Sequence, residues 1–223
     1  TAVADKVEAR LRAAGYGDSQ ITRFAVPDHP KEGGIVAVLP GSAPGLKPLL
    51  LLGHIDVVFA NRADWIRDPY TLIEEGGYFY GRGTSDMKSI DAIWIDSMVR
   101  LHGAKQPPRR TVKMALTCGE ETSGAFNGAQ WLSQNRRELI DAGFALNEGG
   151  GGLTNGKGLS EGGKLVVNEL QVGEKAYQDF TLTVTNPGGH SSQPIPENAI
   201  VTLAQALEKV HAYQFPLQFS DKT

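Results

Sequence analysis

Three short apolar runs, each followed closely by acidic or histidine side chains, constrain the fold of this chain more than any other feature. The runs are Leu49–Leu52, Val112–Leu116 and Phe144–Leu146. A run that is apolar at successive positions is typical of a strand buried on both faces. Helical patterns lie between the runs, and strands that alternate with helices favour a parallel sheet. We therefore predict an α/β fold, a mostly parallel sheet with helices on both faces.

Local patterns predict the remaining elements of this first domain. The expected elements are helices over about residues 2–14, 90–101 and 129–139 and a further strand over Ile35–Leu39. The first helix should end at Gly15, because glycine adopts the left-handed conformation that closes many helices. Near Asp86 the chain enters a glycine-rich turn before the second helix. We place the end of this domain at residue 176.

A second, smaller α+β domain is expected over residues 177–223. Phe180, Leu182 and Val184 alternate with threonines, a pattern that predicts a half-exposed strand. Pro196 should open a helix, since proline is favoured in the first helical turn. The chain starts at Thr1 within a helical pattern and stops before the second domain closes. We therefore expect a fragment whose second domain is only the beginning of a lid.

Composition excludes several classes of protein. A net charge of -3 without a basic block speaks against a nucleic-acid partner. The apolar runs are far too short to span a bilayer, so no membrane partner is expected. A single cysteine, Cys118, rules out an internal disulfide framework. The cytoplasm is the expected compartment, with the periplasm and secretion left open.

The polar residues after the three runs can bind metal. In open α/β sheets, ligands bind at the carboxyl ends of the strands. His54 and Asp56 are two residues apart, so an extended backbone puts both on one face, where the carboxylate can hold the second imidazole nitrogen. An ordinary strand-to-loop junction explains this pair equally well. Glu120 and Glu121 should point in opposite directions, one toward a metal and one toward a substrate.

Asp86 allows two interpretations. As an isolated aspartate before a helix, it is better explained as a carboxylate that stabilises the helix N-terminus. With the other candidates, it could bridge two divalent ions. One histidine and several carboxylates without thiolates favour zinc, with cobalt or manganese as alternatives. A phosphate-binding loop is set aside, because the glycine-lysine pattern of such loops is absent.

An ordered set of segments resembles a known family. The segments are His54–Val58, Trp65–Pro69, Tyr80–Lys88, Gly119–Glu121, Asn147–Gly150 and Pro187–Ser192. Together they resemble the co-catalytic dinuclear zinc hydrolases that include aminoacylase, the carboxypeptidases G and S, and succinyl-diaminopimelate desuccinylase. The resemblance covers nearly the whole chain. It implies a zinc exopeptidase-like fold, two Zn²⁺ ions in each active site of the parent protein, and a homodimer formed through the lid.

The resemblance also implies a role for each candidate residue. His54 and Glu148 would bind one zinc and Glu121 the other, with Asp86 bridging both. Asp56 would orient His54, and Glu120 would act as general base toward a metal-activated water. His190, in the lid, would stabilise the oxyanion, in many members from the partner subunit. The implied substrate is an N-acyl amino acid or short peptide, cleaved at an amide bond next to a free carboxylate.

The chain departs from this family in one important respect. The family supplies a last zinc-binding histidine from a segment that follows the lid, and this sequence contains no such segment. None of His29, His102 and His211 lies where it would replace that ligand. The fragment itself is therefore expected to be inactive. The alternative hypothesis is a truncated, non-catalytic metal-binding or dimerisation fragment.

Overall fold

The computed structural model describes residues 2–26, 28–122, 126–158, 161–173, 178–193 and 195–221. The chain forms two compact units, Thr1–Glu148 and Gly149–Thr223, and each is described by itself. The predicted domain boundary, between residues 176 and 177, falls outside the described residues and stays a prediction.

The first unit contains the predicted strands and helices and several that local pattern did not indicate. Its helices are α1 (Ala2–Ala13), α2 (Lys88–His102), α3 (Gly128–Asn135) and α4 (Arg137–Ile140), with two short 3₁₀ turns, η1 (Asp18–Gln20) and η2 (Arg62–Asp64). Its strands are β1 (Ile21–Val26), β2 (His29–Leu39), β3 (Leu49–His54), β4 (Ile73–Glu75), β5 (Tyr78–Tyr80), β6 (Val112–Thr117) and β7 (Phe144–Leu146).

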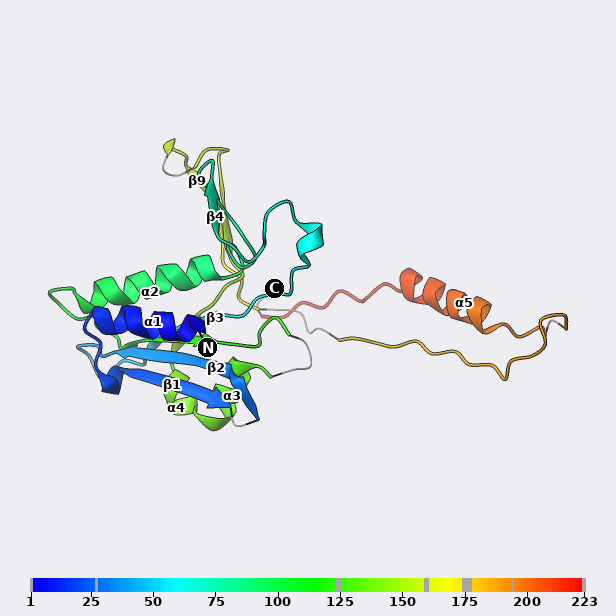
Figure 1. The fold of residues 1–223 in the computed structure, drawn as a ribbon, viewed down its shortest axis with the longest axis horizontal. Coiled ribbons are helices and arrows are strands. Elements are labelled where there is room, and N and C mark those ends of the chain that lie inside the picture. The colour runs from blue at the N-terminus through cyan, green and yellow to red at the C-terminus, as the bar shows by residue number, and fades with distance from the viewer. Residues whose placement is uncertain are drawn as a thin grey trace. The chain divides into compact units, whose positions relative to one another are not determined.

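The central sheet has five strands in the order β1-β2-β6-β3-β7. Its strands β1 and β2 run side by side in Figure 1. Strand β3 runs parallel to both β6 and β7, whereas β1 pairs with β2 and β2 with β6 in antiparallel fashion. The α/β fold is confirmed, but the sheet is mixed. A short connection joins β1 to β2, and strands joined so closely can pair only in the antiparallel sense. The three apolar runs form the parallel part.

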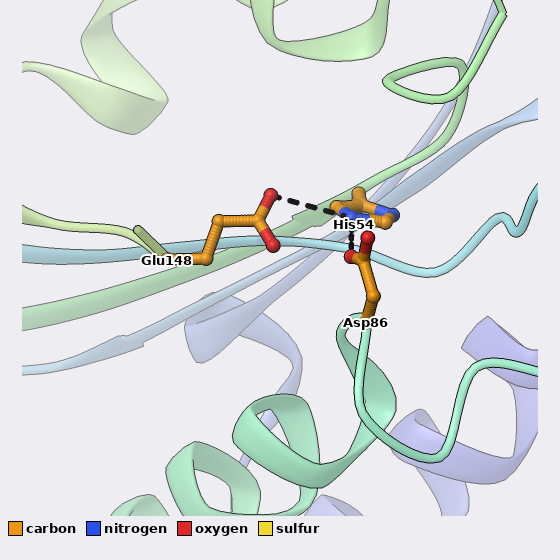
Figure 2. A group of neighbouring side chains, drawn as sticks. All are labelled: His54, Asp86 and Glu148. Atoms are coloured by element: carbon orange, nitrogen blue, oxygen red, sulfur yellow. Dashed lines mark hydrogen bonds and ion pairs between the residues drawn. The ribbon is translucent and has the colours of Figure 1, made fainter. Parts of the chain in front are cut away.

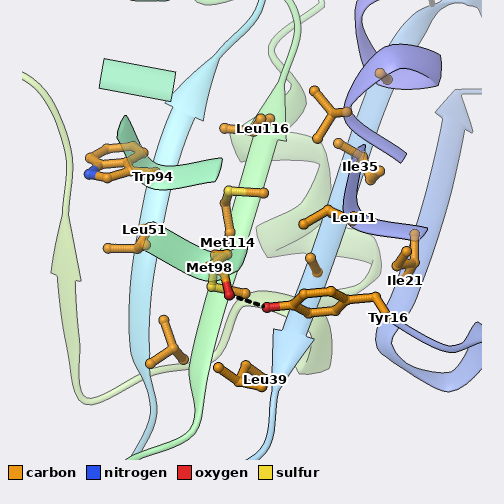
Figure 3. Close-up of a cluster of buried hydrophobic side chains, with 14 of the residues drawn as sticks. Leu11, Tyr16, Ile21, Ile35, Leu39, Leu51, Trp94, Met98, Met114 and Leu116 are labelled. Atoms are coloured by element: carbon orange, nitrogen blue, oxygen red, sulfur yellow. Dashed lines mark hydrogen bonds between the residues drawn. The ribbon is translucent and has the colours of Figure 1, made fainter. Parts of the chain in front are cut away.

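Helices cover both faces of this sheet, as predicted. On one face α1 and α2 pack through side chains such as Leu11 and Met98 (Figure 3). On the other face Leu132 of α3 packs against Phe24 and Leu50. All six residues of β6 are buried, which is the reason why its sequence is apolar apart from Lys113 and Thr117.

One predicted helix differs from the structure, and the predicted end of another is confirmed. The helix expected over 129–139 is divided into α3 and α4, because Arg136 leaves the helical conformation, with φ −142° and ψ 46°. The predicted end of α1 is confirmed, since Gly15 has a φ of 98°. The next residue, Tyr16, is buried, and its hydroxyl donates a hydrogen bond to the Met98 carbonyl of α2 at 2.9 Å.

The second unit contains a β8 (Gly151–Thr154) and β9 (Leu165–Glu169) hairpin and helix α5 (Ala199–Ala212). The strand predicted around Phe180 is wrong: residues 178–190 form no strand, because no described segment pairs with them. Helix α5 begins after Asn198, and not at Pro196, since the Asn198 side chain accepts from the Ile200 amide at 2.9 Å. No helix in the described part of the chain is both long and apolar enough to cross a membrane.

Candidate metal centre

The parallel strands bring their carboxyl ends to one edge of the sheet. His54, the last residue of β3, is in register with Thr117, the last residue of β6. Glu120 and Glu121 follow β6, and Glu148 follows β7. Because β3 lies between the other two strands, its terminal histidine is flanked on both sides by the segments that carry the carboxylates. The sequence-based prediction of a shared site at this edge agrees with the structure.

His54 is at the middle of the site. It is only 2% exposed. Its Nε2 lies 3.0 Å from Asp86 Oδ1, 3.4 Å from Glu148 Oε1 and 3.9 Å from Glu120 Oε2. Figure 2 shows Asp86 and Glu148 directed at the imidazole from different elements. One ring nitrogen therefore faces three carboxylates.

The other ring nitrogen faces Asp56, as expected. The Asp56 backbone carbonyl lies 3.3 Å from His54 Nδ1, and the Asp56 Oδ1 atom lies 3.5 Å from it. The second oxygen of Asp56 accepts a hydrogen bond from the Glu121 amide at 3.1 Å, and the Lys88 ammonium donates to the Asp56 carbonyl at 3.3 Å. These contacts hold Asp56 in place, so that it can fix the orientation of the imidazole.

The two neighbouring glutamates do not face opposite ways. Glu120, Glu121 and His54 each offer a ligand atom, and these atoms lie within 4.8 Å of one another. The prediction assumed an extended strand, but β6 ends at Thr117, and Gly119, with a φ of 89°, turns the chain before the pair. Alternation applies only along a strand. Both carboxylates consequently gather at the same place.

Asp86 does not cap helix α2. The cap position is Met87, which makes no side-chain capping bond, and Asp86 lies one residue earlier, in the turn. Its carboxylate instead contacts His54 at 3.0 Å. Of the two interpretations of Asp86, the structure therefore favours the one that places it in the site.

Several carboxylates surround the imidazole of His54, and these groups shift one another's pKa values. Burial alone favours the neutral imidazole, but Asp56, Glu148 and Asp86 outweigh it and raise the pKa of His54 to about 9. Burial raises the pKa of Glu120 and of Glu148, and their carboxylate neighbours add to the increase, although the charge of His54 opposes it. A divalent cation is the ligand that relieves this repulsion.

The donor set fits a divalent metal. One group consists of His54, Asp86 and Glu148, and the other of His54, Glu120 and Glu121, each with ligand atoms within 4.8 Å of one another. Nitrogen and oxygen donors without thiolate suit zinc. In the described part of the chain these groups contain no histidine other than His54.

His190 lies in the second unit. Its ring Nδ1 contacts the Ser192 hydroxyl at 2.7 Å and accepts from the Ser192 amide at 3.2 Å, and the residue is exposed. The local turn therefore fixes the ring by its Nδ1 atom. Its predicted role stays a prediction.

Sequence reasoning missed Lys88 and Asp91, which lie on α2 beside the site. Asp91 is 4% exposed, and neither carboxylate oxygen has a hydrogen-bond partner among the described residues. Burial raises its pKa to about 7, although His54 and Lys88 act against the increase. An acidic residue between Ile90 and Trp94, on the apolar face of a helix, was a signal that could have identified it.

Comparison with known proteins gives one family and several relatives. The sequence model of peptidase family M20/M25/M40 matches residues 50–220. Human PM20D1, an N-fatty-acyl-amino acid synthase/hydrolase, is 34% identical over 188 residues, which are 83% of this chain and 36% of the human protein. Carboxypeptidase S of Saccharomyces cerevisiae is 30% identical over 192 residues, 83% of this chain and 32% of the yeast protein.

Two further relatives extend the comparison. Aminoacylase-1 of Sus scrofa is 28% identical over 211 residues, 93% of this chain and 47% of the pig protein. A metallo-carboxypeptidase of Sulfolobus solfataricus, Sso-CP2, has a similar fold, with a TM-score of 0.52 and 23% identity over 68% of this chain and 34% of that one. The chain thus spans between about a third and about half of the length of these relatives. It belongs to peptidase family M20/M25/M40.

Proposed function

We propose that this chain carries the metal centre of a zinc-dependent hydrolase that cleaves an amide or peptide bond next to a free carboxylate. The observation that carries the proposal is the surrounding of His54, with Asp86 and Glu148 within 3.4 Å of Nε2 and Asp56 on Nδ1. Metal-binding histidines adopt this arrangement: the imidazole is buried, one carboxylate lies near one ring nitrogen, and further ligands lie near the other.

His54, Asp86 and Glu148 would hold one zinc ion, and Glu121 would hold a second, with Asp86 shared between them. Zinc, when bound, supplies a Lewis acid that polarises a carbonyl and acidifies water. The role of Asp56 is to accept the Nδ1 proton of His54, which leaves Nε2 free as a ligand. The backbone amide of Glu121 and the ammonium of Lys88 keep Asp56 in position for this.

Glu120 is the proposed general base. Its side chain is half-exposed, at 51%, so a substrate can reach it. Burial raises the pKa of its carboxyl above the ordinary value, which brings it closer to the working pH of a proton carrier. It would take a proton from the attacking water and return it to the leaving amine. His190 would donate to the oxyanion in the transition state.

N-acyl amino acids and short peptides are the proposed substrates. The similar proteins support this class, because their names describe an N-fatty-acyl-amino acid synthase/hydrolase, an aminoacylase and a carboxypeptidase. The segment Asn147–Gly150, with Glu148, favours the aminoacylase and carboxypeptidase S branch of the family. A homodimer formed through residues 177–223 is proposed as the assembly.

A second candidate function is a metal-binding or dimerisation module without catalysis. The observation that favours it is the single histidine of the site, since the two candidate groups in the described residues share His54 and no other imidazole. Two fully ligated zinc ions would need a further donor.

Glu120→Gln tests the proposal. Zinc content and hydrolysis of N-acyl amino acids and dipeptides are measured on the chain and on the complete gene product that contains it. We expect the substitution to lower kcat by about 10²–10⁴-fold with little change in zinc content, because a general base contributes that much. Glu74→Gln, at an exposed residue of β4, is the matched control and should leave kcat unchanged.

Two results would contradict the proposal. One is a Glu120→Gln protein as active as the unsubstituted protein. The other is a complete protein that binds zinc and hydrolyses none of the substrates, which would favour the module without catalysis.

A further inference from the structure

A cavity of about 660 Å³ lies beside the metal centre, in the first unit. Its wall is mostly apolar and comes from the chain after β3, the β4–β5 region and α2. The apolar side chains that matter most are Val57, Pro69, Leu72, Phe79, Ala92 and Ile93. Leu72, Phe79 and Ile93 are each more than 60% exposed. Exposed apolar side chains that meet around one hollow indicate a binding surface.

None of the candidate metal ligands lines the cavity, but several lining residues are their neighbours in the chain. Val57 follows Asp56 in the chain, and Thr84 precedes Asp86 by two residues; both line the cavity. Lys88 lines it as well, and its ammonium donates to the Asp56 carbonyl at 3.3 Å. Lys88 therefore joins the lining of the cavity to Asp56, which places the cavity next to the centre.

Hydrogen bonds hold the wall of the cavity in place. The Tyr70 hydroxyl accepts from the Ala60 amide at 2.8 Å and donates to the Ala60 carbonyl at 3.1 Å. The Arg82 amide donates to the Pro69 carbonyl at 2.7 Å, which ties the two ends of the β4–β5 region together. The hollow is therefore formed before any ligand arrives, as most small-molecule sites are.

The charges of the lining select the kind of group that can enter. Among the described residues the lining contains no carboxylate, and its charged members are Arg82 and Lys88. The free amino group of a peptide would meet two cations and no counter-ion there. An uncharged acyl chain has no such cost, and it gains from burial against the apolar wall.

We propose that this cavity binds the acyl chain of an N-acyl amino acid, and that medium to long chains are preferred to acetyl. The inference rests on the proposed hydrolytic function and names the substrate class of that site. The volume lies within the roughly 300–1,000 Å³ of pockets that bury most of a drug-sized ligand, so a two-carbon acyl group would leave it largely empty. Each methylene buried from water improves binding by about fourfold.

Binding is measured first, on the zinc-free chain, so that no turnover occurs. Titration calorimetry compares N-decanoyl-phenylalanine with N-acetyl-phenylalanine. Ala92→Trp fills the cavity from α2, and Leu72→Asp places a charge in its lining. Arg100→Trp is the matched control, because Arg100 is an exposed residue of the same helix outside the cavity. Circular dichroism establishes that all variants keep the fold.

We expect the decanoyl ligand to bind at least 100-fold more tightly than the acetyl ligand. Ala92→Trp and Leu72→Asp should each raise its Kd at least tenfold and leave the acetyl ligand within twofold. Arg100→Trp should change neither. Equal weakening of both ligands, or no effect of either cavity variant on the decanoyl ligand, would overturn the inference.

Hydrolysis by the zinc-loaded complete protein separates this inference from the proposed function. Hydrolysis of N-acetyl-phenylalanine together with a chain-length-independent Kd would refute the cavity assignment and leave the proposed function standing. Absence of hydrolysis together with a cavity-dependent Kd would refute the function and support the cavity as an acyl-chain site. A preference for free dipeptides over N-decanoyl-phenylalanine would also overturn the inference.

Discussion

At the scale of single residues, the site is a set of charges, some buried and some exposed, whose energies depend on one another. His54 is surrounded by carboxylates on both ring nitrogens, and its pKa rises to about 9 although burial alone would lower it. A metal ion and a proton therefore compete for Nε2. Asp86, exposed at 62% of its side chain, remains accessible to an incoming ion.

Asp91 gives a prediction of pH dependence. Burial raises its pKa from 3.8 to about 7, so the folded chain binds a proton there more strongly than the unfolded chain does. The stability that this proton provides is present at low pH and is lost as the pH rises from about 4 through about 7. Asp91→Asn should therefore raise the free energy of unfolding at pH 8 by up to about 4 kcal/mol and have little effect at pH 4.

Urea unfolding of both proteins at pH 4, 6 and 8 checks this prediction. Asp96→Asn is the control, because Asp96 is on the same helix but half-exposed and paired with Arg100. That change should be within about 0.5 kcal/mol at all three pH values. A gain for Asp91→Asn that is the same at pH 4 and pH 8 would show that Asp91 does not titrate in this range.

At the scale of elements, the turn after β6 determines where the two glutamates lie. Gly119 has a φ of 89°, and a Cβ at that position would collide with the Phe126 carbonyl oxygen. Only glycine adopts this conformation at low cost. The turn is thus required for the gathering of Glu120 and Glu121 beside His54.

Gly119→Ala should lower the free energy of unfolding by about 1–3 kcal/mol, because it adds both backbone strain and a steric clash. Thermal and urea unfolding measure the change. Gly45→Ala is the matched control: Gly45 lies in a turn with no atom within 4 Å of the added Cβ, and its substitution should be nearly neutral. Equal stability of the two variants would mean that the turn after β6 relaxes freely.

The sequence predicted the three strands of the parallel part of the sheet and missed the short strands β4 and β5 and the interrupted strand β1. Phe144–Leu146 is the observed extent of β7, and Val112–Leu116 lacks only the last residue of β6. Strand β1 was missed because Thr22 and Arg23 interrupt its apolar pattern. The strand predicted around Phe180 had the right alternation, but a strand also needs a neighbour to pair with.

The same reasoning explains the outcome for the site. Strand ends predicted which side chains would meet, because parallel neighbours share one edge. The directions of Glu120 and Glu121 could not be predicted, since they depend on a tertiary contact between Gly119 and Phe126. The position of Asp91 likewise depends on the approach of α2 to Gly53, which no local pattern encodes.

At the scale of the whole molecule, the first unit by itself assembles the candidate ligands. His54, Asp86 and Glu148 all belong to Thr1–Glu148, and so does the apolar cavity. The proposed contribution of His190 comes from the second unit. Metal binding should consequently depend on the first unit, and catalysis on both.

The position of a bound zinc ion tests the central claim most directly. Crystals of the zinc-loaded chain, measured at the zinc absorption edge, locate the ion without any assay of activity. We predict an anomalous peak about 2.0–2.2 Å from His54 Nε2 and from one carboxylate oxygen each of Asp86 and Glu148. A zinc-loaded crystal with no peak at His54, or with zinc bound only elsewhere, would contradict the account.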